Sequence, residues 1–390
     1  MEFDRALGKI IKSRLGYFPV MAITGPRQAG KTTTIKHLFP KYEYYNLENL
    51  SVLAALKNDP LSVLEGYKNG LVIDEIQRFP EMLSYIQAHV DNSRKMGKII
   101  VSGSQNLLIS EKIAQTLAGR VAYCYMYSMS LSELDKNKLI KKDVYEQMRF
   151  GGYPAIYDRK IPPEIYYEQY LATYIERDVR TLRNVGDLSQ FRKLLILLAG
   201  RVGQLVNYNS LSNDLGVSGK TVEDWLSVLE ASYIIFRLQP YFRNIGKRLI
   251  KSPKIYFYDT GVLCHLLGIT ETKALKSHYS VGSIFENLII LEVEKTLKNS
   301  GIVAKTYFYR DSNGNEVDLL IQIGEKIVPV EIKLSRTFST EFLKGVQYWQ
   351  KSVANQEPGW VVYTGESHAL GNVRLVSWTD LGKKLNGLGK

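Results

Sequence analysis

The sequence predicts an α/β fold in which a doubly wound, mostly parallel sheet is followed by a helical region and a second α/β unit. Strand-like and helix-like runs alternate over residues 1–135, which is typical of a parallel sheet covered by helices. The pattern turns helical over residues 136–255 and becomes mixed again over residues 256–390. A chain of 390 residues is also long enough for two or three domains.

The composition is that of a soluble globular protein, with 45% hydrophobic and 23% charged residues. A formal net charge of +12 favours a polyanionic partner. Cys124 and Cys264 match no metal or redox spacing and are expected to be buried, reduced thiols. No signal peptide or apolar run of about 20 residues is found, so a cytoplasmic protein without a membrane span is expected.

The segment over residues 25–33 fits the phosphate-binding pattern GxxxxGK[ST]. An apolar run, Val20 to Ile23, precedes it and a helix-like run follows. Glycines allow backbone N–H groups to surround a phosphate chain, while Lys31 would neutralise phosphate oxygens and Thr32 would hold Mg²⁺. The expected nucleotide-binding residues here are Gly25, Pro26, Arg27, Gln28, Ala29, Gly30, Lys31, Thr32 and Thr33.

Two further polar groups follow apolar strands and complete a nucleotide hydrolase pattern. Within residues 71–77, an apolar strand ends in Asp74, which would hold Mg²⁺ through water, and Glu75, which would polarise the attacking water. Ser104 follows the strand-like run KIIVSG, where it could sense the γ-phosphate; an ordinary polar loop is the alternative. The sequence therefore predicts a nucleotide hydrolase that uses Mg²⁺.

Residues 209–240 predict a helix-turn-helix followed by a wing. A short helix is expected to end near Leu215 and a longer one to run from Gly219 to Ala231. The second helix carries acidic residues that a major groove would repel, so only shape or backbone binding is expected, with a structural role between subunits as the alternative. The candidate DNA contacts are Lys220, Arg243, Lys247, Arg248, Lys251 and Lys254.

The third unit holds polar residues in an order that suggests a second metal site. Glu286 lies on an expected helix, Asp318 on a strand, and Glu331 and Lys333 on the next strand. Alternation points Glu331 and Lys333 to the same face. Asp318 and Glu331 would bind Mg²⁺ together with a backbone carbonyl, and Glu286 could bind it through water. Lys333 would orient a water or offset phosphate charge. A salt bridge between strand edges is the alternative.

In order, the segments GPRQAGKTT, LVIDEIQ, IIVSGSQN, LAGRV and FGGYPAIY resemble the prokaryotic AAA-family (AAA+) ATPases that carry a C-terminal domain of unknown function. The resemblance covers nearly the full chain. It implies an AAA+ P-loop core over residues 1–135, a helical lid and winged helix over 136–255, and a PD-(D/E)xK, restriction-endonuclease-like domain over 256–390. ATP and Mg²⁺ are the implied ligands, and a homo-oligomeric ring, such as a hexamer, is the implied working form.

The resemblance also suggests roles for two arginines. Arg120, in LAGRV, resembles the arginine that such ATPases present to a neighbour's γ-phosphate, and a plain surface arginine is the alternative. Arg177 is a lesser candidate for an arginine that reaches the nucleotide from the lid.

The expected function is ATP-driven binding and remodelling of DNA, with branched DNA such as a Holliday junction as a candidate substrate. Whether the third unit cuts DNA or only binds it stays open. The alternative is a nucleotide-controlled switch that binds a protein partner and carries an inactive nuclease fold. Phosphate transfer to another substrate is disfavoured, because Glu75 directly after Asp74 suits activation of water better.

Overall fold

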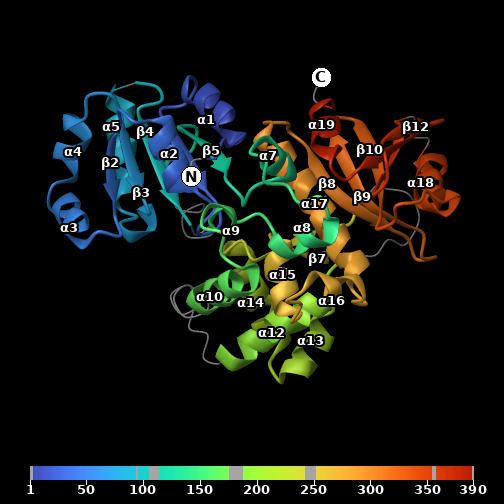
Figure 1. Ribbon diagram of the computed structural model, residues 1–390. Coiled ribbons are helices and arrows are strands. Elements are labelled where there is room, and N and C mark those ends of the chain that lie inside the picture. Colours follow the sequence, from blue (N-terminus) through green and yellow to red (C-terminus); the bar gives the residue numbers. More distant parts are fainter. Residues whose placement is uncertain are drawn as a thin grey trace. The chain divides into compact units, whose positions relative to one another are not determined.

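The computed structural model describes residues 3–93, 95–104, 113, 115–174, 188–241, 252–353 and 357–388. The chain divides into two compact units (Figure 1). The N-terminal unit comprises Met1–Met129 with the short segments Ala231–Tyr233 and Lys298–Ser300, and the C-terminal unit comprises the remainder. Both cysteines are free and buried, as expected. No helix among the described residues is both long and apolar enough to cross a bilayer.

The N-terminal unit is built on a five-stranded sheet in which all neighbouring strands are parallel, in the order β2-β3-β4-β1-β5. The prediction of a doubly wound parallel sheet is confirmed. The strands are β1 (Val20–Thr24), β2 (Glu43–Asn46), β3 (Leu71–Asp74), β4 (Ile99–Gly103) and β5 (Val121–Tyr125). The helical elements are α1 (Leu7–Leu15), α2 (Lys31–Leu38), α3 (Leu50–Asn58), α4 (Pro60–Gly66), η1 (Ile76–Arg78) and α5 (Met82–Ser93).

Helices cover both faces of this sheet because successive strand residues point to opposite sides. Val20 and Ala22 pack with α3, α4 and α5 in one hydrophobic core. Met21 and Ile23 pack with α1 and α2 in the other. Since both faces are covered, the strands are apolar runs rather than alternating ones.

A helical region opens the C-terminal unit. Its elements are α7 (Leu131–Lys136), α8 (Val144–Phe150), α9 (Pro154–Asp158), α10 (Pro163–Tyr174), α12 (Leu188–Gly200), α13 (Tyr208–Leu215), α14 (Gly219–Ala231), β6 (Ile235–Leu238), β7 (Lys254–Phe257), α15 (Thr260–Leu266) and α16 (Thr272–Lys276). The side chain of Asn207 caps the start of α13, and Gly216 ends it at φ +65°, a conformation that favours glycine. Helices α13 and α14 therefore match the two predicted helices, and β6 and β7 form an antiparallel ribbon after them.

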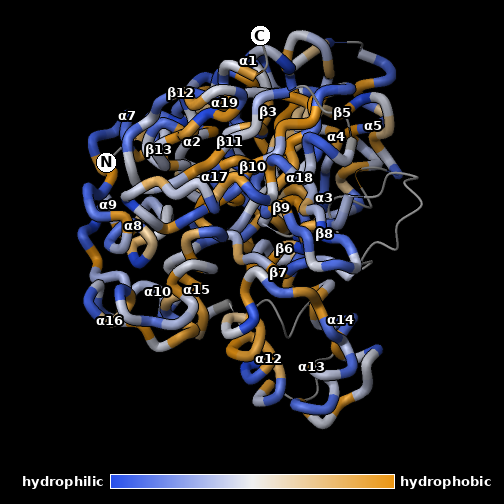
Figure 2. Tube along the Cα trace, turned by 90° about the vertical axis from the view of Figure 1, so that its right-hand side faces the viewer, coloured by the Kyte–Doolittle hydropathy of each residue, from blue (hydrophilic) through white to orange (hydrophobic). Residues whose placement is uncertain are grey.

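The rest of the C-terminal unit contains a mixed six-stranded sheet in the order β12-β13-β11-β10-β9-β8. Its elements are α17 (Val281–Asn299), β8 (Lys305–Arg310), β9 (Glu316–Ile323), β10 (Lys326–Lys333), η3 (Thr340–Leu343), α18 (Lys344–Val353), β11 (Gly359–Tyr363), β12 (His368–Leu370), β13 (Val373–Ser377) and α19 (Leu381–Asn386). Strands β9 and β10 form the expected hairpin, with Val330 opposite Leu319. Hydrophobic residues gather along β9, β10 and β11 (Figure 2). The prediction of a separate C-terminal α/β region is thus confirmed.

Candidate functional site

The phosphate loop, residues 25–33, connects β1 to α2. Gly25 has φ +150°, and a Cβ there would lie 2.0 Å from the backbone oxygen of Met126. Gly30 has φ +93° and immediately precedes α2. Only glycine fits both positions without strain, and the loop delivers the N-terminus of α2 and its partial positive charge to the site. Of the predicted loop residues, Gly25, Pro26, Ala29 and Lys31 are buried, whereas Gln28 and Thr33 are exposed.

The Lys31 ammonium is folded back onto its own loop. Its Nζ donates to the carbonyl oxygens of Gly25 at 2.9 Å and Pro26 at 2.8 Å. Burial lowers the pKa of Lys31 to about 8, although Glu75 and Asp74 oppose this shift. Phosphate oxygens offer a buried ammonium a full negative charge where the carbonyls offer only dipoles, so Lys31 is poised to exchange one set of acceptors for the other.

Asp74 is the centre of the site because strand order brings three hydroxyls to it. Thr32 Oγ1 donates to Asp74 Oδ2 at 2.6 Å, Tyr44 donates to the same oxygen, and Ser102 donates to Oδ1. Asp74 is 1% exposed. Burial and the bond to Asp74 raise the pKa of Tyr44. A hydroxyl and a carboxylate in contact fit the oxygen ligands that Mg²⁺ prefers, so Thr32 and Asp74 are the residues that would hold it.

Glu75 is held in an unusual conformation beside this site. Its backbone is left-handed, at φ 59° and ψ 46°, which is rare for a residue other than glycine. Its Oε2 accepts hydrogen bonds from Gln77 Nε2 and, at 3.2 Å, from Ser104 Oγ. Ser104 follows β4, which lies between β1 and β3. The structure therefore brings Glu75 and Ser104 together and adds Gln77, which the sequence reasoning missed.

Arg5 is a second residue that the sequence reasoning missed. Its guanidinium donates to the backbone oxygens of Ala29 at 2.6 Å and Tyr127 at 2.7 Å. Arg5 is 8% exposed. It therefore ties the phosphate loop to the chain that leaves β5. The sequence offered no signal for this contact, because the three residues are far apart along the chain.

Arg120 lies beside the first residue of β1, at the edge of the sheet opposite the phosphate loop, since its carbonyl accepts from the Val20 N–H. Its guanidinium makes a two-pronged ion pair with Asp91, at 2.5 and 2.9 Å. A role toward a neighbouring subunit would require that pair to open. Arg177 lies outside the described residues.

The predicted DNA contacts have different environments. Lys220 is exposed at the start of α14, whereas Arg243, Lys247, Arg248 and Lys251 lie outside the described residues. The expectation for Lys254 is corrected by the structure. Lys254 is 3% exposed on β7 and its ammonium pairs with Glu286 and Glu316, so it cannot follow a phosphate chain from the surface.

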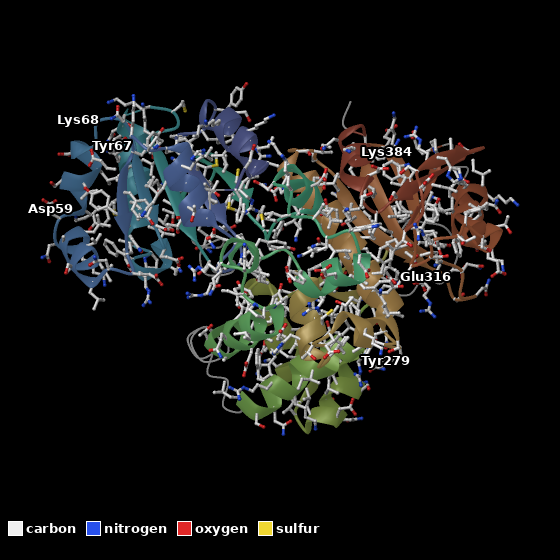
Figure 3. All side chains as sticks on the ribbon, in the orientation of Figure 1. Asp59, Tyr67, Lys68, Tyr279, Glu316 and Lys384 are labelled. Atoms are coloured by element: carbon white, nitrogen blue, oxygen red, sulfur yellow. The ribbon has the colours of Figure 1, made fainter. Side chains whose placement is uncertain are left out.

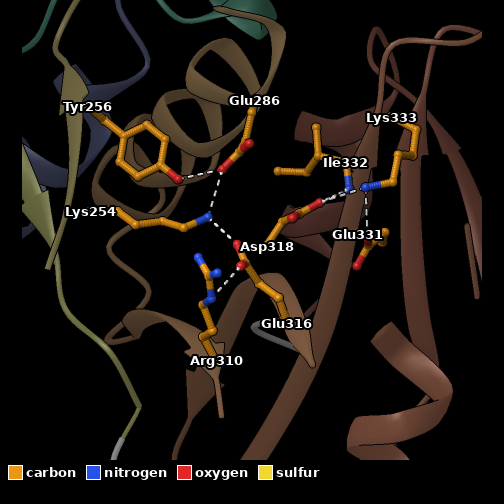
Figure 4. A network of polar contacts seen from close by, with 9 residues as sticks. All are labelled: Lys254, Tyr256, Glu286, Arg310, Glu316, Asp318, Glu331, Ile332 and Lys333. Atoms are coloured by element: carbon orange, nitrogen blue, oxygen red, sulfur yellow. Dashed lines mark hydrogen bonds and ion pairs between the residues drawn. The ribbon is translucent and has the colours of Figure 1, made fainter. Parts of the chain in front are cut away.

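The C-terminal unit collects the residues of the second predicted site in one network, which we call the acid–lysine cluster (Figure 4). Its members are Lys254, Glu286, Glu316, Asp318, Glu331 and Lys333. Lys333 Nζ lies 2.7 Å from Glu331 Oε1 and 3.4 Å from Asp318 Oδ2. Asp318 also accepts from the Ile332 N–H at 2.8 Å. Hairpin register thus joins Asp318, Glu331 and Lys333, as the sequence indicated.

Glu286 belongs to a different part of this cluster. It projects from α17 and accepts hydrogen bonds from Tyr256 at 2.5 Å and Lys254 at 3.4 Å. Lys254 also lies 2.5 Å from Oε1 of Glu316, the first residue of β9 (Figure 3). Burial lowers the pKa of Lys254, but Glu286, Glu316 and Asp318 outweigh it and raise the value overall. Both Lys254 and Glu316 were missed as members of this site.

The fit of a metal ion to this cluster is partial. Within the part of the chain that the structure describes, no three His, Cys, Asp or Glu side chains are arranged to hold one. Asp318 and Glu331 remain as candidate ligands, because Glu331 Oε2 is buried and has no hydrogen-bond partner. A buried oxygen without a hydrogen-bond partner is a candidate position for contact with a bound ion. Burial and the neighbouring Asp318 raise the pKa of Glu331 to about 8, and a bound cation would favour its charged form.

Family models match three consecutive segments of the chain, and the first of them lies almost entirely in the N-terminal unit. Residues 17–135 match a family model described as an AAA domain. Together with the parallel sheet and the phosphate loop, this match supports a P-loop ATPase domain of the AAA class in the N-terminal unit. Residues 141–273 and 281–381 match two domains of unknown function, DUF8612 and DUF4143.

The most similar relatives include uncharacterized proteins of mycobacteria and an archaeon. One from Mycobacterium tuberculosis is 29% identical over 324 residues, which cover 82% of this chain and 71% of that protein. One from Methanocaldococcus jannaschii is 25% identical over 379 residues, covering 88% and 81%. Among solved structures, a Walker-type ATPase of Pyrococcus abyssi is similar with a TM-score of 0.46 and 13% identity, covering 68% of this chain and 95% of that one.

Proposed function

We propose that this chain is a Mg²⁺-dependent AAA+ ATPase that uses ATP hydrolysis to bind and remodel DNA. The observation that carries the ATPase chemistry is the contact of Thr32 with Asp74 beside a buried Lys31. Lys31 leaves the loop carbonyls and binds the β- and γ-phosphates. Mg²⁺, when held by Thr32 and Asp74, supplies positive charge to the same oxygens.

Glu75 is the group that polarises the attacking water. Its left-handed backbone and its contacts with Gln77 and Ser104 fix where the carboxylate points. Ser104 lies next to Glu75 and at the sheet edge where phosphate would bind. Contact of Ser104 with the γ-phosphate would therefore change its hydrogen bond to Glu75. Hydrogen bonds of this kind position a base without changing its chemistry.

The DNA-binding part of the proposal is supported by the two-helix and ribbon arrangement of α13, α14, β6 and β7 in a chain of net charge +12. Helix α14 exposes both Lys220 and Glu223, so contacts to the backbone or shape of DNA are expected rather than base readout. Branched DNA, such as a four-way junction, is the substrate we expect, and a homo-oligomeric ring is the expected assembly.

The experiment measures ATP hydrolysis with Mg²⁺, alone and with linear, single-stranded and four-way-junction DNA, while strand integrity is followed in the same tubes. Stimulation by one DNA form supports a DNA-remodelling ATPase and identifies its substrate. Lys31→Ala serves as the control that removes turnover. Any cleavage is assigned by Asp318→Ala, which should abolish cutting and leave ATP hydrolysis in place.

The role of Arg120 in a ring is tested by mixing subunits. Arg120→Ala should lose ATPase activity, and mixing it with Lys31→Ala subunits should restore part of that activity if the arginine acts on the neighbour's nucleotide. Asp91→Ala is the matched control, because it frees Arg120 from its ion pair without removing it. Failure of the mixture to recover activity would remove Arg120 from the site.

A second candidate function is a nucleotide-controlled switch that binds a protein partner. The observation that favours it is that ammonium groups face the carboxylates of the acid–lysine cluster, which suits an inert nuclease-like fold. This function predicts slow ATP turnover that DNA does not change, and no salt-sensitive DNA binding.

A further inference from the structure

The cation that faces Glu286 and Glu316 is an ammonium of the chain itself. In Figure 4, Lys254 lies between the two carboxylates, with Nζ 3.4 Å from Glu286 Oε1 and 2.5 Å from Glu316 Oε1. The ammonium also lies 5.4 Å from the centre of the Phe308 ring. The Lys254 side chain is 4% exposed, and those of Glu286 and Glu316 are 18% and 27% exposed, so the ammonium is buried while its carboxylate partners are only partly buried.

The backbone holds this lysine in place from two sides. Lys254 is opposite Leu238 in the β6–β7 ribbon and forms a bridge with Leu205 on its other side. Arg310 forms a second ion pair with Glu316, at 3.4 Å. The backbone at Lys254 is therefore fixed on both sides, and Glu316 is paired with two cations of the chain itself.

We propose that Lys254 permanently occupies the position that a metal ion would need beside Glu286, so that Glu286 is a counter-ion of Lys254 and not a metal ligand. A divalent cation binds carboxylate oxygens at about 2.0–2.6 Å, and an ammonium already 3.4 Å from the same Glu286 oxygen would repel it. The C-terminal unit then binds at most one divalent ion, at Asp318 and Glu331. Lys333 lies 2.7 Å from Glu331 Oε1, but the other oxygen, Oε2, is buried without a hydrogen-bond partner and is the atom left for a cation.

This inference rests on the proposed function and specifies which residues of the C-terminal unit would bind a metal ion. Its test counts the ions that the chain binds in the absence of DNA and nucleotide. Mn²⁺ is titrated into the full chain and measured by calorimetry and by the loss of the free-ion electron paramagnetic resonance signal. All variants carry Asp74→Asn, so that the phosphate-loop site does not contribute. DNA-stimulated ATP turnover is measured separately on the chain without Asp74→Asn, so failure of the remodelling function leaves this count unaffected.

Glu286→Gln is expected to leave Mn²⁺ affinity within about twofold, whereas Glu331→Gln should lower it at least about tenfold. Lys254→Met should gain one additional Mn²⁺, and Lys254→Met with Glu286→Gln should lose that additional ion. Added Mn²⁺ should also raise the thermal midpoint of Lys254→Met more than that of the parent chain, because an ion that binds only the folded state stabilises it.

Two results would overturn the inference. One is a tenfold or greater loss of Mn²⁺ affinity in Glu286→Gln, which would make Glu286 a ligand. The other is a folded Lys254→Met chain that gains no ion. If Lys254→Met does not fold even with Mn²⁺, the inference is decided by the Mn²⁺ affinity of Glu286→Gln relative to the parent chain.

Discussion

The phosphate-loop site and the acid–lysine cluster both gather buried carboxylates, but their partners differ in charge. Asp74 is surrounded by the hydroxyls of Thr32, Tyr44 and Ser102, which are neutral. In the cluster, Glu286 and Glu316 face the ammonium of Lys254. A carboxylate that hydroxyls solvate keeps its negative charge for an incoming cation, whereas one that meets an ammonium is already neutralised. In the proposed function Asp74 binds a cation directly, whereas Glu286 and Glu316 are already paired with the ammonium of Lys254.

The largest expected effect tests whether the charge of Asp74, whose hydrogen-bond partners are neutral hydroxyls, drives turnover. Asp74→Asn keeps the size and some hydrogen bonds but removes the charge, so ATP hydrolysis should fall by about a hundredfold or more. Asp318→Asn is the matched change in the other site and should leave ATP hydrolysis unchanged. Steady-state phosphate release measures both, and comparable losses in the two variants would erase the distinction between the sites.

The second prediction tests whether the ammonium of Lys254 stabilises the folded state. Lys254→Ala leaves the partly buried Glu286 and Glu316 without the ammonium that they share, so the free energy of unfolding should fall by about 1–3 kcal/mol. Lys220→Ala, an exposed change of the same kind, should alter it by less than about 0.5 kcal/mol. Urea unfolding followed by circular dichroism measures the difference, and similar midpoints for the two variants would contradict the prediction.

The sequence predicted those parts of both sites that local order determines. The loop from Gly25 to Thr32 is one continuous motif, and Asp318 meets Glu331 through a hairpin whose register follows from two adjacent strands. Hydrogen-bond partners that meet only through the pairing of strands far apart in sequence could not be predicted. Ser102 meets Asp74 only because β4 lies between β1 and β3.

Lys254 shows why charge patterning alone misled. It ends a basic stretch that contains no acid, which is typical of a solvated surface. Its burial arises because β7 packs beside α17, from which Glu286 projects 32 residues later along the chain. One-dimensional patterning cannot distinguish a lysine that faces solvent from one whose acidic partners arrive from another element.

Glu292 extends the comparison to a carboxylate whose main partners are backbone N–H groups. It is 2% exposed and accepts from Leu131 N at 2.7 Å and Ser132 N at 3.4 Å. Burial raises its pKa from 4.5 to about 7, although these bonds oppose the shift. The folded state therefore binds the proton more tightly, so the stability that protonated Glu292 contributes is complete below about pH 4.5 and is lost as the pH rises through about 7.

Glu292→Gln should remove this pH dependence while keeping the shape of the side chain. Relative to the parent chain, the variant should become more stable by about 1–3 kcal/mol between pH 5 and pH 8. Urea midpoints of both chains at pH 5, 6, 7 and 8 provide the measurement. A constant difference across this range would mean that Glu292 keeps one protonation state throughout.

The smallest expected effect concerns Arg5, which braces the phosphate loop without contacting the cation site. Its guanidinium bridges Ala29 O and Tyr127 O, and a lysine cannot reproduce that two-pronged contact. Arg5→Lys should therefore raise the Kd for ATP about tenfold, the size of one lost charge-assisted hydrogen bond. Arg14 is a matched control, because it donates to a β5 carbonyl, Tyr123 O, at 2.7 Å.

Arg14→Lys should lower the thermal midpoint without changing the Kd for ATP, since it makes a similar contact away from the phosphate loop. Fluorescent nucleotide titration of both variants separates the two cases. Equal affinities would mean that Gly25 and Gly30 shape the loop without help from Arg5. A loss of affinity confined to Arg5→Lys would mean that nucleotide binding at the phosphate loop depends on a residue far from the loop in sequence. In the same way, the charge balance of the acid–lysine cluster depends on Lys254, which is distant in sequence from Glu286 and Glu316.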